Sequence, residues 1–168
     1  QGVFGNLKFD VVPDAAQLAR GRAWRARSAR PVVMLASSRE GEEAMWLDVF
    51  KQNWHPALSQ QAPAAINSEA NQGVSPVQWL VVPRHPQRFA EVQQQLRGAG
   101  LSVSSRSQWA GAPEPADVWL GDSLGEMALY YGLADVALLG GSFESLGGQN
   151  LIEAAACACP LVLGPHTF

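Results

Sequence analysis

The sequence lacks the features that characterise several common classes of protein. Only 16% of its 168 residues are charged and its formal net charge is −3, so it lacks the basic surface that general nucleic-acid binding requires. No apolar run reaches the ~18 residues of a membrane-spanning helix. Because 47% of the residues are hydrophobic, the composition favours one globular domain with a sizeable core over a disordered chain.

Cysteine is scarce too, since Cys157 and Cys159 are the only two. A C-x-C pair can bind a metal ion, but no other cysteine exists, and His166 is the only histidine near them in the sequence. We therefore expect no metal site. Both residues are interpreted as reduced core cysteines of a cytosolic protein.

Several enzyme signatures are missing. The turn after the first predicted strand holds one glycine, so the dinucleotide fingerprint G-x-G-x-x-G is absent from its proper place. Neither the phosphate loop G-x-x-x-x-G-K-[ST] nor the nucleophile elbow G-x-S-x-G occurs. The sequence offers binding groups without an obvious nucleophile or base.

Short apolar runs alternate with helical patterns along the chain. This alternation predicts βαβ units, and hence an α/β, Rossmann-like, doubly wound, mainly parallel sheet of about six strands. The predicted strands are 31–36, 77–82, 101–104, 117–120, 136–139 and 161–163, and the predicted helices are 40–51, 87–97, 124–131 and 150–157, with an arginine-rich helix ahead of the first strand.

Two regions depart from this rhythm. Residues 53–76 are rich in Gln, Ala, Asn, Ser and Pro and have no apolar period, so we predict a mobile surface insertion there. After residue 163, a doubly wound domain would normally add a covering helix. We therefore expect the chain to be a piece of a longer protein, truncated at its C-terminus.

The most informative stretch runs from Gly140 to Glu153, between an apolar run and a helical pattern. Glycines let the backbone come close to a ligand, and a helix start offers unpaired N–H groups and a positive dipole end that favour phosphate. Glu153 lies one turn inside the helix, where its carboxylate can accept hydrogen bonds from sugar hydroxyls. Asn150-x-x-Glu153 equally matches a capping box that only starts the helix. The pattern alone leaves both interpretations open.

A second group of polar residues follows the second predicted strand (77–82), in the segment Pro83–Pro86. Ligands of parallel sheets bind beyond the carboxyl ends of the strands. The planar guanidinium of Arg84 can pair with a phosphate. His85 has two possible roles: it donates a hydrogen bond to a phosphate or ribose, or it caps the helix. Pro86 suits the first helical position.

Two Ser-x-x-Glu sequences lie at the same predicted edge, Ser37 to Glu40 and Ser123 to Glu126. Both match capping boxes, and for the first pair we expect no more than helix initiation.

Five arginines crowd around Trp24, at positions 20, 22, 25, 27 and 30. A basic helix with an aromatic residue can rest on an anionic membrane surface. The segment has few large apolar residues to bury, so a solvated helix face is the favoured interpretation.

Seven motifs occur in a fixed order along the chain. They are Gly5–Asp10, Ser37–Glu43, Pro83–Pro86, Gly121–Glu126, Gly140–Ser142, Asn150–Glu153 and Gly164–Phe168. This set resembles the C-terminal half of the bacterial Kdo (3-deoxy-D-manno-oct-2-ulosonic acid) transferases, which build the inner core of lipopolysaccharide. The resemblance covers nearly the whole chain apart from the insertion.

The resemblance implies a two-domain glycosyltransferase of the GT-B type. Residues 1–168 would form the domain that binds the donor CMP-Kdo, without a metal ion or cofactor. An N-terminal domain, absent from this chain, would hold the lipid A precursor and the catalytic base, so the fragment alone would be inactive. The full-length protein would work at the cytoplasmic face of the bacterial inner membrane, while the fragment itself would be soluble.

The same resemblance implies the site residues. The implied donor-binding residues are Arg84, His85, Gly125, Glu126, Gly140, Gly141, Ser142, Gln149, Asn150 and Glu153. Relatives usually have a histidine where this chain has Gln149, and Thr-His where it has Ser38-Arg39.

Two alternatives for the function remain. The chain could be the donor half of a UDP-sugar-dependent GT-B enzyme, or a non-catalytic α/β binding module.

Overall fold

The computed structural model describes residues 12–54, 75–146 and 151–167. Within these ranges six strands form one sheet, ordered β3-β4-β2-β1-β5-β6, and every neighbouring pair is parallel. The strands are β1 (Val32–Ser38), β2 (Gln78–Pro83), β3 (Val103–Ser105), β4 (Val118–Leu120), β5 (Val136–Leu139) and β6 (Leu161–Leu163).

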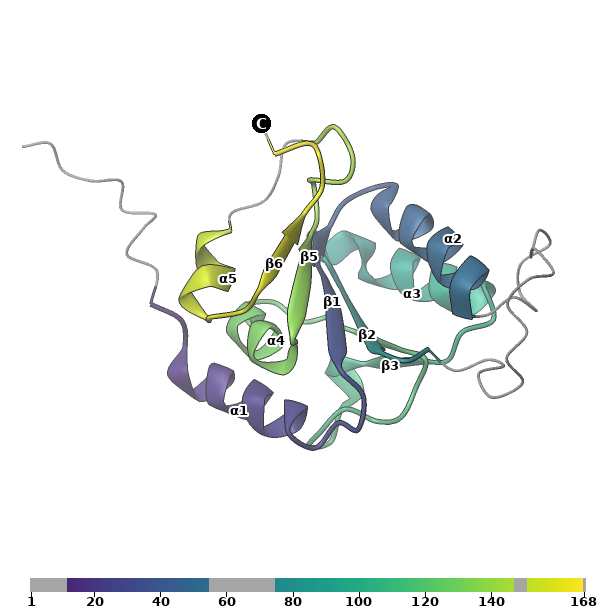
Figure 1. Cartoon of the computed structure of the whole chain (residues 1–168). Helices are drawn as coiled ribbons and strands as arrows, with labels where there is room; N and C mark the ends of the chain where they lie inside the picture. The colour runs from purple at the N-terminus through teal and green to yellow at the C-terminus, as the bar shows by residue number, and fades with distance from the viewer. Residues whose placement is uncertain (1–11, 55–74, 147–150, 168) are drawn as a thin grey trace, which may run out of the picture.

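Helices cover both faces of the sheet, with α2 and α3 on one face and α1, α4 and α5 on the other (Figure 1). This arrangement confirms the predicted doubly wound, Rossmann-like fold. The helices are α1 (Ala15–Arg25), α2 (Glu42–Trp54), α3 (Phe89–Gly98), α4 (Met127–Leu133) and α5 (Ile152–Ala156), with 3-10 turns η3 (Pro86–Arg88) and η4 (Arg106–Gln108).

Alternate residues of the central strands supply the two halves of the core. In β1, Met34 joins the cluster on the α4 side, whereas Leu35 joins the cluster on the α2 side. In β2, Leu80 and Val81 divide in the same way. Successive side chains of a strand point to opposite faces, so a continuous apolar run is what a strand covered on both faces requires.

The α-helices begin two or three residues later than predicted, and for α2 and α4 the backbone gives the reason. The segment before α2 bends at Ser37, which adopts a φ of +54°, and α2 begins at Glu42. The carboxylate that bonds back to the chain is that of Glu42, which accepts from the N–H of Arg39. The predicted capping box of Ser37 and Glu40 is therefore wrong, because this bend shifts the helix start by two residues.

The α4 helix begins at Met127 rather than 124. Gly125 adopts a φ of +71°, which ends any helical path through the preceding residues. Ser123 and Glu126 bond to each other through their side chains, and neither side chain caps the helix.

Part of the predicted insertion belongs to a helix, since α2 continues to Trp54. Residues 55–74 lie outside the described residues.

The arginine-rich segment forms α1, and three of its arginines are bound within the protein. Arg22 donates to the carbonyl of Cys157, Arg25 pairs with Asp135, and Arg30 donates to the carbonyl of Ser75. No helix within the described ranges is long and apolar enough to cross a membrane. A solvated helix face stays the favoured interpretation, and contact with a membrane surface stays the alternative.

The α1 and α4 helices touch where two glycines meet. A Cβ atom on Gly21 would lie 2.1 Å from the carbonyl oxygen of Leu129, and one on Gly132 would lie 2.5 Å from the carbonyl oxygen of Leu18. Both obstacles are backbone atoms, so the helices must separate to accommodate a side chain.

Gly21→Ala should therefore lower the free energy of unfolding by about 1–3 kcal/mol, the usual cost of overpacking a well-filled contact. Urea denaturation measures this loss. Gly98→Ala is the matched control, because a Cβ there meets nothing within 4 Å and alanine favours helix by up to about 1 kcal/mol. Equal stability of the two variants would show that the helices are not in close contact.

Candidate functional site

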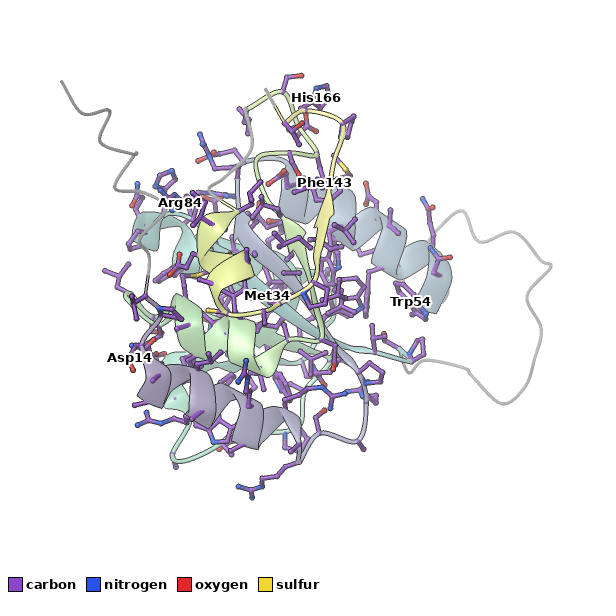
Figure 2. All side chains as sticks on the ribbon, turned by 60° about the vertical axis from the view of Figure 1, so that its left-hand side comes forward. Asp14, Met34, Trp54, Arg84, Phe143 and His166 are labelled. Carbon is purple, nitrogen blue, oxygen red and sulfur yellow. The ribbon has the colours of Figure 1, made fainter. Side chains whose placement is uncertain are left out.

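The strand order reverses around β1, which has β2 on one side and β5 on the other. Ligands of open parallel sheets bind in the crevice beyond the carboxyl ends of the strands at such a point. The loop after β1, the segment after β2 and the glycine-rich turn after β5 all start from this edge. Figure 2 shows Arg84, from the segment after β2, and Phe143, from the turn after β5, in the upper part of the molecule.

The N–H groups at the start of the glycine-rich turn are bonded inside the protein. Gly140 donates to the carbonyl of Ala36 at 2.8 Å, Gly141 to Oε2 of Glu42 at 2.8 Å, and Phe143 to Oε1 of Glu42 at 3.1 Å. Gly140 also permits a close approach of two loops, since a Cβ there would lie 2.4 Å from the carbonyl oxygen of Ser37. These groups position the turn. Any contact of Gly140 or Gly141 with a donor stays a prediction.

Ser142 lies fully buried at 0% exposure. Its hydroxyl donates to the carbonyl of Leu139 and accepts from the N–H of Gly164 at 2.9 Å. The carbonyl of Ser142 accepts from the N–H of His166. The side chain of Ser142 therefore joins the turn after β5 to the segment after β6. Its predicted role on a phosphate stays a prediction.

A second buried carboxylate holds the other side of the edge. Glu43 is 1% exposed and accepts from Ser38 Oγ at 2.7 Å and from both terminal nitrogens of Arg88, at 2.9 and 3.2 Å. Arg88 ends the 3-10 turn η3 that begins at Pro86, so this pair fixes the segment carrying Arg84 relative to α2.

Glu42, Glu43 and Arg88 were not among the predicted site residues. A signal for them exists in the sequence: Glu42, Trp46 and Phe50 share one helix face at spacings of four residues, and the latter two are core residues. A carboxylate on an apolar helix face must be buried, and a buried carboxylate must find hydrogen-bond donors. Which donors it finds depends on the fold.

Arg84 and Glu153 are brought together, as predicted for one site. Arg84 is exposed and Glu153 is partly buried, and Tyr131 of α4 lies beside both. Burial raises the pKa of the Glu153 carboxyl, and the positive charge of Arg84 opposes that rise. Burial likewise raises the pKa of Tyr131, and the charge of Glu153 adds to the increase. An exposed arginine and a partly buried carboxylate are therefore close enough to influence each other's charge at this edge of the sheet.

The remaining predicted residues are placed differently. His85 precedes η3 without capping it through its side chain. Glu126 accepts from Nη2 of Arg106 at 2.7 Å, and the carbonyl of Gly125 accepts from Gln17 at 2.9 Å. These contacts tie the loop after β4 to α1 and η4, so Glu126 already has a cationic partner. Gln149 and Asn150 lie outside the described residues.

Cys157 and Cys159 are buried and form no disulfide, as the sequence predicted. Burial raises the pKa of both thiols, that of Cys159 to about 11. No group of three or more His, Cys, Asp or Glu residues in the described part of the chain is arranged to hold a metal ion.

An apolar hollow is lined in part by Glu42 and Phe143. It has a volume of about 170 Å³ and lies between α2 and the sheet, with Leu35, Trp46, Trp79 and Leu138 in its lining. Neither Arg84 nor Glu153 lines it, and its walls offer almost nothing for an anion to bind.

Known proteins similar to this chain are Kdo transferases. The 3-deoxy-D-manno-octulosonic acid transferase of Bordetella pertussis is 49% identical over 168 residues, and that of Haemophilus influenzae is 33% identical over 168 residues. Each alignment covers 99% of this chain but only 36% or 35% of the relative. The chain thus spans about a third of the length of the curated relatives it matches. No family model matches the sequence.

A solved structure agrees with this result. The C-terminal CMP-Kdo binding domain of WaaA from Acinetobacter baumannii superimposes with a TM-score of 0.67 at 28% identity. The match covers 92% of this chain and 74% of that domain. The resemblance inferred from the seven motifs is confirmed: the chain is a homologue of Kdo transferases along its whole length, and its fold is that of their C-terminal domain.

Ser142→Ala tests whether the hydroxyl supports the turn or faces a ligand. Because the change removes the acceptor of the partly buried N–H of Gly164 and the buried donor to Leu139, we expect the free energy of unfolding to fall by about 1–3 kcal/mol. Ser145→Ala, at an exposed residue of the same turn, should cost much less. Thermal and urea denaturation of both variants decide the matter, and an unchanged stability of Ser142→Ala would contradict a supporting role.

Arg84→Ala should raise the pKa of Glu153 further above its ordinary value. The substitution removes the positive charge that lowers this pKa and leaves the burial that raises it. Glu153 then stays protonated to a higher pH. A ¹³C NMR titration of the side-chain carboxyl measures the change, with Arg97→Ala on the exposed end of α3 as control. A pKa that does not move would place Arg84 away from Glu153.

Proposed function

We propose that this chain, a homologue of the Kdo transferases along its whole length, is the domain that binds the donor CMP-Kdo. The observation that carries the proposal is this homology, together with the likeness to a solved domain whose title describes CMP-Kdo binding. The site supports it locally, because an exposed arginine and a partly buried carboxylate lie together beyond the carboxyl ends of the strands.

The chemistry of the transfer asks for an anion-stabilising group in this domain. When Kdo leaves CMP-Kdo, negative charge builds up on the phosphate of CMP. Arg84 supplies a guanidinium that stays charged at any working pH and fits phosphate oxygens in pairs. A charge placed in advance where negative charge develops lowers the barrier to the reaction without any metal ion.

The other predicted residues take supporting roles in the proposal. Glu153 accepts hydrogen bonds from ribose hydroxyls, and His85 donates to the phosphate or to the ribose. The turn at Gly140 and Gly141 shapes the wall of the site rather than binding the phosphate through those two N–H groups, because they are bonded to Ala36 and Glu42. The chain's own residues thus bind and orient the donor.

The remaining parts of the reaction belong to the longer relatives. Since the chain spans 36% of its Bordetella pertussis relative, we propose that the general base and the site for the lipid A precursor lie in another domain. The full-length protein would then act at the cytoplasmic face of the inner membrane. On its own, the 168-residue chain is expected to bind CMP and to transfer nothing.

Titration of the chain with nucleoside monophosphates tests the proposal. CMP should bind more tightly than UMP or AMP, as calorimetry or NMR will show. Equal affinities would remove the assignment to a CMP-linked donor and favour a UDP-sugar-dependent enzyme or a plain binding module. For the last of these, Glu153→Gln would change stability while nucleotide binding stayed undetectable.

Arg84→Ala should weaken CMP binding by about 1.5–3 kcal/mol, the size of a lost charge-assisted hydrogen bond. Arg97→Ala, which removes an exposed arginine from α3, is the matched control and should leave the affinity unchanged. Equal affinity of the Arg84 variant and the native chain would remove Arg84 from the site.

A further inference from the structure

Glu42 is a buried carboxylate at the crevice between the ends of β1 and β5. It is 2% exposed, and its two oxygens accept from three backbone N–H groups: Arg39 at 2.8 Å, Gly141 at 2.8 Å and Phe143 at 3.1 Å. The donors come from both loops that border the crevice. The ion pairs found among the described residues leave Glu42 out.

Backbone N–H groups converging from a glycine-rich turn are the usual means by which an α/β fold holds a phosphate. Here the same geometry holds a side chain of the protein. Gly141 adopts a φ of +73°, which aims its N–H toward Glu42. The carboxylate therefore occupies the place where such turns in other proteins bind a phosphate group.

We propose that Glu42 determines specificity by restricting the site to donors with a single phosphate. The inference rests on the proposed function and deepens it. A nucleoside monophosphate needs one anion site, and Arg84 at the end of β2 provides it. A nucleoside diphosphate needs a second anion site. The N–H groups of Gly141 and Phe143 at the start of the turn could provide one, but they are already bonded to Glu42.

Two physical effects oppose a second phosphate at this place. The phosphate would lose its hydration without gaining the hydrogen bonds of Gly141 and Phe143, and an unpaired charge removed from water is costly. It would also approach the negative charge of Glu42 in a poorly hydrated part of the protein, where like charges repel over longer distances than in bulk water. Both effects act against CDP and leave CMP unaffected.

Calorimetric titration of the full 168-residue chain with CMP and with CDP tests the inference. The native chain should bind CMP at least about tenfold more tightly than CDP. Glu42→Gln keeps the size of the side chain and removes its charge, so the preference for CMP should fall by about tenfold. The amide signals of Gly141 and Phe143 in a ¹⁵N–¹H spectrum should shift in this variant.

Glu43→Gln is the matched control. Glu43 is the next residue, equally buried, and carries the same charge, but it bonds to Ser38 and Arg88 instead of the turn. Because Glu43 fixes the segment that carries Arg84, this variant should lose stability and bind CMP and CDP more weakly to the same extent, so that the ratio of the two affinities stays within about twofold of the native value. A general effect of buried charge loss would move both ratios alike and would overturn the assignment to Glu42.

The remaining outcomes are distinguishable from failure of the proposed function. If CMP binds in preference to UMP and AMP but CDP binds as tightly as CMP, the donor-binding role stands and the role of Glu42 is overturned. If Glu42→Gln does not fold, Glu42→Asp is tested in its place. This variant keeps the charge and should keep the preference for CMP over CDP, and loss of that preference would overturn the inference. A chain that binds no nucleotide overturns both.

Discussion

Two adjacent carboxylates at the start of α2 fix the geometry of the ligand edge. Glu42 bonds to the turn after β5, and Glu43 bonds to Arg88 behind the segment that follows β2. Through them one helix start sets the positions of three loops at once. A charge taken out of water is tolerated only with full hydrogen bonding, so each carboxylate is stable only while its loop stays in place. The same bonds that fix the loops also hold the carboxylates.

The strands and their order of appearance were predictable because both faces of this sheet are covered. Continuous apolar runs such as that of β2 are what burial on two sides demands, and they separate clearly from the polar segments between them. Helix starts were less predictable. The positive φ of Ser37 and of Gly125 shifts two starts by two or three residues, and no capping pattern in the sequence shows such a bend.

The glycine-rich turn marks the limit of what motif analysis gives for the site. Glycines in the right place predict N–H groups that are free to bind an anion, whereas in the structure those of Gly140, Gly141 and Phe143 are bonded within the protein. The pattern does not contain the identity of the acceptor, because Glu42 lies about a hundred residues away in the sequence and reaches Gly141 only in the folded sheet. The hydrogen-bond partner of Ser142 was hidden for a similar reason, because Gly164 follows a later strand. The positions of Arg84 and Glu153 at the ligand edge were predictable, because Arg84 directly follows β2 and Glu153 lies in the first turn of α5. Their roles in donor binding stay predictions.

The contact between α1 and α4 has a mechanical consequence. Gln17 near the start of α1 bonds to Gly125 just before α4, and Arg25 at its end bonds to Asp135 just after α4, so the two helices run parallel and are attached at both ends. With Gly21 pressed against the α4 backbone, α1 cannot slide or rotate independently. A displacement of α1 is therefore expected to carry α4 and the loop after β4 with it.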